Sequence, residues 1–195
     1  MRSIARRATD DPRGASMITR GHDLSFLTPA VILLGSVALA ARPPVVPIAA
    51  AVVAAVGIIG AVTPLPPPRD ARREAAPAFA VIALGVLAFA AARAITTPLP
   101  TPVTVFTAGA TIVAAVAEEI FFRRLVYGWL ATGGAVVAIV GAAGLFAAVH
   151  VPAYGVRAFP LDLTAGILFG WQRWATGGWA APGLTHAAAN ALLLF

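Results

Sequence analysis

Long apolar runs, separated by short breaks of proline, glycine or charge, dominate the chain. The runs cover about residues 25–41, 45–62, 76–95, 103–130, 135–150, 160–174 and 179–195. Several of them reach the length of about 17–20 residues that an α-helix needs to cross a hydrocarbon core. The pattern therefore predicts an all-α fold, a polytopic transmembrane helical bundle of about six or seven spans.

The breaks predict where individual helices begin and end. Gly133 and Gly177 each lie in a Thr-Gly-Gly sequence, which is a turn signal. Pro152 is predicted to stop the fifth segment just after His150, because the residue before a proline is pushed out of the helical region. Pro160 suits the first turn of the sixth segment. Pro182 is predicted either to kink the last segment or to start its helical part.

The composition predicts that lipid surrounds most of the chain. Hydrophobic residues make up 59% of the 195 positions and charged residues only 11%, whereas a soluble domain carries about 25% charged residues. Cysteine is absent, which excludes disulfides, thiolate nucleophiles and cysteine metal sites. The net charge of +6 is spread along the chain without a basic face, so we expect no nucleic-acid partner.

The charges also predict a domain organisation and an orientation. We expect residues 1–24 to be a disordered, arginine-rich tail, residues 25–100 to form about three transmembrane helices, and residues 101–195 to form a catalytic transmembrane core. Arginines concentrate in the tail and in the segments on the same side, which favours a cytoplasmic N-terminus. All basic residues are arginine and alanine is abundant, which is typical of a GC-rich bacterial genome and indicates a bacterial cytoplasmic membrane.

Two adjacent carboxylates follow the uncharged run of residues 108–117. Placing a charge at the bilayer centre costs about 2.5 to 3.5 kcal/mol or more, so each of these carboxylates is expected to have a structural or functional role. Glu119 and Arg123 are four residues apart and can pair on one helix face. Glu118 is turned by about 100° from Glu119 and can face a cavity as a general base. The alternative is structural, with both acids at a membrane interface, balanced by Arg123 and Arg124.

Two of the three histidines lie in apolar segments. His150 ends the fifth segment four residues after Phe146, and its alternative role is to cap a helix C-terminus. His186 and Asn190 are also four residues apart and share one face of the last segment, where the alternative is hydrogen bonding between helices.

The turn at Gly133 is expected to bring two of these groups together. Glu118 precedes Gly133 by 15 residues and His150 follows it by 17. Both therefore lie about 22 to 26 Å from the turn along a helix. Two antiparallel helices would place Glu118 beside His150.

These three short clusters, in this order, resemble the motifs of the CPBP family. That family comprises type II CAAX prenyl endopeptidases and bacterial bacteriocin-processing and immunity proteins, also called the ABI family, and the resemblance covers roughly residues 101–195. It implies a type II CAAX-protease-like helical fold and an intramembrane glutamic endopeptidase, a hydrolase that needs no cofactor and acts on membrane-associated peptides or proteins.

The resemblance also implies a role for each residue. Glu118 would activate water, which His150 would orient, and His186 and Asn190 would stabilise the oxyanion. The supporting residues would be Glu119, Arg123 and Phe146.

Three other functions stay open from the sequence. A zinc protease would use Glu118, His150 and His186 as metal ligands, and chelators would inhibit it. A non-catalytic immunity or partner-binding membrane protein would keep its biological effect in a Glu118→Gln variant. A proton or solute transporter would use intramembrane Glu and His as a relay, but the first three spans carry almost no polar residues.

Overall fold

The computed structural model describes residues 27–41, 46–66, 75–95 and 104–192. Within these ranges the chain is all-helical, and its longer helices contain 13 to 20 residues. They are α1 Leu27–Ala40, α2 Val46–Val62, α3 Ala78–Ala94, α4 Val105–Glu119, α6 Ala135–Tyr154, α7 Phe159–Thr176 and α8 Ala180–Leu192. The predicted tail 1–24, the charged loop 69–74 and the proline-rich break 96–102 lie outside the described residues.

The predicted segments agree with the observed helices in number and approximate position. Pro160 lies in the first turn of α7, as expected, and Gly177 ends that helix with φ 73°. Gly134, with φ 102°, precedes α6. Pro182 lies in the first turn of α8, so it starts the helix and does not kink it.

The prediction that the fifth segment stops at Pro152 was wrong. Helix α6 continues through Pro152 to Tyr154, and Gly155 ends it with φ 79° while donating its N–H to the carbonyl of Val151 at 2.8 Å. A proline removes one helical hydrogen bond and crowds one carbonyl. Pro152 is exposed and only two residues from the helix end, so the remaining turn is kept.

The fourth segment contains a feature that the sequence did not predict. Helix α4 passes into a π-helical segment, Ile120–Val126, then into the single-turn helix α5, Tyr127–Leu130, and a final 3₁₀ turn, Ala131–Gly133. π-Helical turns are rare and are frequently found at functional sites. Here the π-helical segment carries Arg123.

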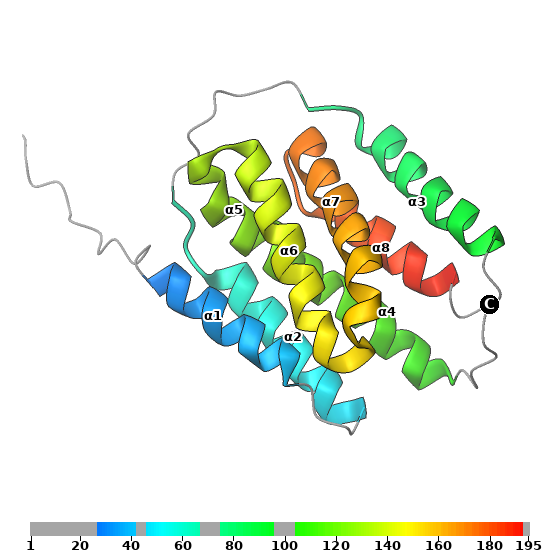
Figure 1. The fold of residues 1–195 in the computed structure, drawn as a ribbon, viewed down its shortest axis with the longest axis horizontal. Coiled ribbons are helices and arrows are strands. Elements are labelled where there is room, and N and C mark those ends of the chain that lie inside the picture. The colour runs from blue at the N-terminus through cyan, green and yellow to red at the C-terminus, as the bar shows by residue number, and fades with distance from the viewer. Residues whose placement is uncertain (1–26, 42–45, 67–74, 96–103, 193–195) are drawn as a thin grey trace, which may run out of the picture.

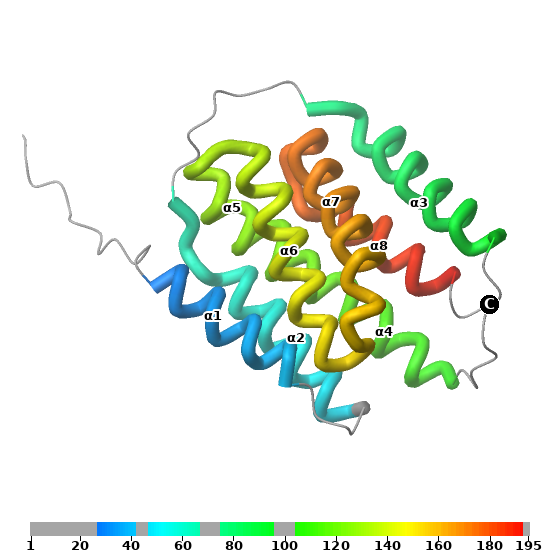
Figure 2. The backbone as a smooth tube through the Cα atoms, in the orientation of Figure 1, coloured from blue at the N-terminus to red at the C-terminus, as the bar shows by residue number. Residues whose placement is uncertain are grey.

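Helix α4 and its π-helical extension occupy the middle of the helical arrangement (Figure 1). α2 and α8 pack against α4, α6 packs along α7, and α3 lies at an edge against α8 and α7. The tube in Figure 2 shows α1 and α2 on the side opposite α3. Aromatic and aliphatic side chains fill the centre, among them Phe121, Phe122, Leu125, Phe146 and Phe169.

Two glycines let α6 and α7 approach closely. A Cβ at Gly166 would lie 2.9 Å from the Cα of Ala143, and a Cβ at Gly170 would lie 3.2 Å from the Cα of Ile139. Glycines four residues apart are a common device for close packing of membrane helices. The tight contact holds His150, on α6, in a fixed position relative to α7.

The outer surface is strongly apolar. Large side chains such as Leu34, Ile58 and Phe79 are 68%, 64% and 84% exposed. Within the described residues, two helical stretches, Val105–Gly133 and Ala135–Tyr154, are long and apolar enough to cross a membrane, and α1, α2 and α3 are shorter apolar helices. The predicted count of six or seven spans stays a prediction.

Candidate active site

The buried ion pair expected between Glu119 and Arg123 is present. Arg123 Nε lies 3.1 Å from Glu119 Oε2, and both side chains are fully buried. Arg123 Nη2 also donates to the carbonyl of Gly166 at 3.2 Å. The guanidinium lies 4.8 Å from the ring centroid of Phe146 and 5.3 Å from that of Phe169. Aromatic faces and a carboxylate together offset the cost of burying this cation.

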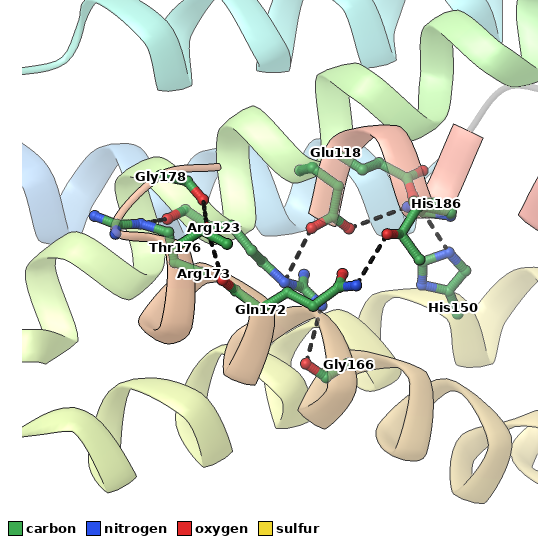
Figure 3. Close-up of polar contacts among 11 residues, drawn as sticks. Glu118, Arg123, His150, Gly166, Gln172, Arg173, Thr176, Gly178 and His186 are labelled. Atoms are coloured by element: carbon green, nitrogen blue, oxygen red, sulfur yellow. Dashed lines mark hydrogen bonds and ion pairs between the residues drawn. The ribbon is translucent and has the colours of Figure 1, made fainter. Parts of the chain in front are cut away.

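Glu118 and His150 face each other, as the distances along the helices predicted. Glu118 Oε2 lies 3.7 Å from His150 Nε2 (Figure 3). His150 Nδ1 lies 2.7 Å from the carbonyl oxygen of Phe146. Because a carbonyl only accepts, Nδ1 carries the proton, and in the neutral ring Nε2 is the acceptor. His150 therefore presents a lone pair next to the Glu118 carboxylate.

His186 has a partner that the sequence analysis did not assign to it. Its Nδ1 lies 3.0 Å from Glu119 Oε1, so Glu119 contacts both Arg123 and His186. Asn190, one helical turn further along α8, donates its Nδ2 to the carbonyl of Thr111 at 3.4 Å. α8 thus places His186 and Asn190 on the same side of the bundle as Glu118.

One cavity of about 770 Å³ is lined by Glu118, His150, His186 and Asn190. Its walls come from α2, α3, α4, α6, α7 and α8 and are mostly apolar. The polar or aromatic side chains among its lining residues include Glu118, His150, His186, Asn190, Phe146, Thr107, Thr111, Arg93, Tyr154 and Asp162. The four residues predicted to be catalytic therefore line a single cavity, while Glu119 and Arg123 lie behind its wall. Their chemical roles stay predictions.

The sequence analysis missed three residues of this cavity. Tyr154 stacks on His150, with ring centroids 5.7 Å apart and planes 15° apart. Tyr154 follows His150 by four residues, a spacing that places two side chains on one face of a helix. The predicted helix end at Pro152 put Tyr154 outside the helix, so this spacing was not considered. Asp162 and Arg93 belong to helix ends, where a charged residue is ordinarily explained by solvent or the helix dipole.

A buried glutamine, also missed, connects three helices beside His186. Gln172 Nε2 lies 2.9 Å from the carbonyl oxygen of Val81 on α3 and 2.9 Å from Thr185 Oγ1 on α8. Thr185 is the residue before His186. Arg173, next to Gln172, donates its Nε to the carbonyl of Arg123 at 3.0 Å (Figure 3). These contacts fix α8 and the π-helical segment against α7.

The arrangement of acids and histidines bears on metal binding. Among the residues that the structure describes, no three His, Asp or Glu side chains are grouped so that they could hold one metal ion. His150 and His186 each direct Nδ1 to a protein oxygen. A role without a cofactor stays a prediction, to be tested with chelator.

Comparison with known proteins gives one family match, in the second half of the chain. Residues 98–192 match the family described as type II CAAX prenyl endopeptidase Rce1-like. No curated protein and no solved structure matches the chain. The family match and the two long apolar helices together indicate a membrane protein. Over residues 98–192, the chain is similar to the Rce1-like family of type II CAAX prenyl endopeptidases.

Proposed function

We propose that this protein is an intramembrane endopeptidase that hydrolyses membrane-associated peptides or proteins with a carboxylate-activated water. One observation carries the proposal: Glu118 and His150, from different helices, face each other at 3.7 Å in a cavity that His186 and Asn190 also line. An apolar cavity with a few convergent polar groups is the usual form of a binding site.

The Glu118–His150 distance suits a bridging water. Oε2 and Nε2 are both acceptors and lie too far apart for a direct hydrogen bond. A water between them donates one proton to each, which orients its lone pair toward a substrate carbonyl. Glu118 takes a proton as the water attacks the carbonyl carbon. The same proton then passes to the nitrogen of the leaving amine as the C–N bond breaks.

The negative charge on the tetrahedral intermediate needs donors. Asn190 supplies an amide N–H, and His186 supplies Nε2–H when both ring nitrogens carry protons. In that state the Nδ1 proton of His186 points to Glu119 Oε1, 3.0 Å away. One preorganised donor of this kind contributes about 10²- to 10³-fold to kcat. Glu119 and Arg123 are positioning residues in this scheme.

We also propose the placement of the chain in the bilayer. It crosses a bacterial cytoplasmic membrane several times, about six or seven, with the N-terminus in the cytoplasm. The arginine distribution supports the orientation, and the exposed apolar side chains of α1, α2 and α3 support contact with lipid. A cavity lined mostly by apolar groups suits a membrane-anchored substrate.

The test is peptide cleavage by the purified protein in nanodiscs. The panel contains membrane-anchored and lipidated peptides, and the variant Glu118→Ala is run beside the wild-type chain, with and without excess chelator. Cleavage that survives chelator and is lost in Glu118→Ala supports the proposal. Loss with chelator and recovery with zinc would replace it by the zinc mechanism. If no peptide is cleaved and Glu118→Ala keeps the full cellular effect, the chain is a non-catalytic immunity or partner-binding protein.

A further inference from the structure

Asp162 is an acidic residue of the cavity that the proposed mechanism does not use. It lies in the first turn of α7 and lines the same cavity as Glu118 and His150. Its Oδ2 is buried and has no hydrogen-bond partner in the part of the chain that the structure describes. A buried carboxylate oxygen without a donor is costly, so a role inside the protein or in the cavity is required.

The start of α7 does not use this carboxylate for capping. In a capping box, an acid three residues after the N-cap residue accepts the N–H of that residue, whereas Asp162 lies four residues after it. Here that residue is Ala158, and its N–H donates to the carbonyl of Gly155 at 3.1 Å. The helix dipole alone favours an acid there by about 0.3–1 kcal/mol, but it does not direct the side chain into the cavity.

Asp162 does not orient either histidine by a hydrogen bond. His150 directs Nδ1 to the carbonyl of Phe146 and Nε2 to Glu118. His186 directs Nδ1 to Glu119. Asp162 nevertheless lines the same cavity as His150, Glu118 and His186.

The charges around the cavity favour a cationic occupant. Glu118 and Asp162 place two carboxylates on its walls, and the basic side chains among the described lining residues are Arg93 on α3, His150 and His186. None of these basic side chains donates a hydrogen bond to the buried Oδ2 of Asp162. The Glu119 carboxylate is balanced separately by Arg123. A donor for this oxygen can therefore be supplied by a molecule that enters the cavity.

We propose that Asp162 determines specificity by binding a lysine or arginine side chain of the substrate near the scissile bond. The inference rests on the proposed peptidase function and names the substrate class for that site. The side chain's ammonium or guanidinium group donates to the carboxylate, and its aliphatic stem packs on the apolar wall. This contact sets which peptide bond lies over Glu118.

The experiment compares matched peptides. A lysine is moved one position at a time along a membrane-anchored fluorogenic peptide, and each peptide has a partner with norleucine at that position. At one position, we expect wild-type protein to cleave the lysine peptide with a kcat/KM about 10-fold or more above its partner, as for a hydrogen bond to a charged group. Asp162→Asn should bring this ratio close to one, because it lowers kcat/KM for the lysine peptide much more than for the norleucine peptide.

Two further variants separate specificity from structure. Asp162→Glu keeps the charge and should retain a clear lysine preference. Thr164→Ala removes a hydrogen bond to the carbonyl of Pro160 in the same helical turn, without touching the cavity, and should keep the full preference. Equal cleavage of both peptides by wild-type protein at every position, or an Asp162→Asn defect that is the same for both peptides, would overturn the inference.

Binding keeps the inference testable if the peptidase proposal fails. The same peptides are titrated against Glu118→Gln protein in nanodiscs, with and without Asp162→Asn. Tighter binding of the lysine peptide that disappears with Asp162→Asn supports the role of Asp162 even if no peptide is cleaved. Equal affinity for both peptides in both proteins overturns it, and cleavage by wild-type protein would then leave the peptidase proposal standing.

Discussion

Two adjacent carboxylates, Glu118 and Glu119, belong to two different clusters of polar side chains. One cluster lines the cavity, and the other lies behind the cavity wall. The closed cluster consists of Glu119, Arg123 and the Nδ1 side of His186, and both members of its ion pair are fully buried. The open cluster consists of Glu118 and His150, whose side chains are 5% and 8% exposed and line the cavity. Glu118 and Glu119 are adjacent on α4 and therefore differ by about 100° of rotation around the helix axis. This rotation directs the Glu118 carboxylate to the cavity and buries the Glu119 carboxylate in the protein.

The difference assigns separate tasks to the two clusters. In the closed cluster every named contact is made to the protein: to the carbonyl of Gly166, to aromatic rings and to Glu119. It therefore fixes the helices on which the open cluster depends. Changes in the closed cluster should first affect folding, and changes in the open cluster should first affect turnover.

The largest expected effect is on folding, from Arg123→Ala. Removing this guanidinium leaves the Glu119 carboxylate buried without its ion-pair partner, and breaking a buried pair in this way costs about 3–5 kcal/mol of unfolding free energy. Denaturant unfolding in detergent micelles measures it. Arg157→Ala removes an exposed arginine and should change stability by less than about 0.5 kcal/mol. Equal stability of the two variants would contradict the structural role of the closed cluster.

The sharpest test of the comparison makes the same chemical change at adjacent positions. Glu118→Gln should lower kcat by about 10²- to 10⁴-fold, the contribution of a general base, with an unfolding free energy close to that of wild type. Glu119→Gln should instead lower the unfolding free energy by about 3 kcal/mol, because Arg123 loses its counter-charge. Kinetics and unfolding of both variants give the answer. Similar defects in both would mean that the two carboxylates act as one unit.

A third prediction concerns the packing that connects the clusters. Gly166→Leu forces a side chain against Ala143 on α6, where even a Cβ would lie within 2.9 Å of a backbone atom. Overpacking of this kind costs about 1–3 kcal/mol, and it also displaces the carbonyl that accepts from Arg123. Gly144 on α6 has nothing within 4 Å of an added Cβ, so Gly144→Leu is the matched control. Equal melting temperatures would show that α6 and α7 do not depend on this close approach.

The sequence predicted the elements that local patterns define. Helix positions follow from apolar runs, and the Glu119–Arg123 pair and the Glu118–His150 approach follow from helix geometry and a turn. The contacts of Gln172 with Val81 and Thr185 join residues 91 and 13 positions apart, and no local pattern indicates them. No local pattern indicates the π-helical segment that contains the buried Arg123. The continuation of α6 past Pro152 depends on the proline's exposed position. Asp162 was missed because its place in a first turn has an ordinary explanation.

The smallest expected effect comes from Phe146, which contacts both clusters. Its ring centroid lies 4.8 Å from the Arg123 guanidinium and 4.5 Å from the ring centroid of His150. Phe146→Leu keeps an apolar side chain but removes the aromatic face, which costs about 1–2 kcal/mol. Because the ring touches both clusters, stability and kcat should fall together, each by a moderate amount. Phe79→Leu, at a position that is 84% exposed, should change neither. A fall in kcat alone would place Phe146 with the open cluster, and a fall in stability alone would place it with the closed one.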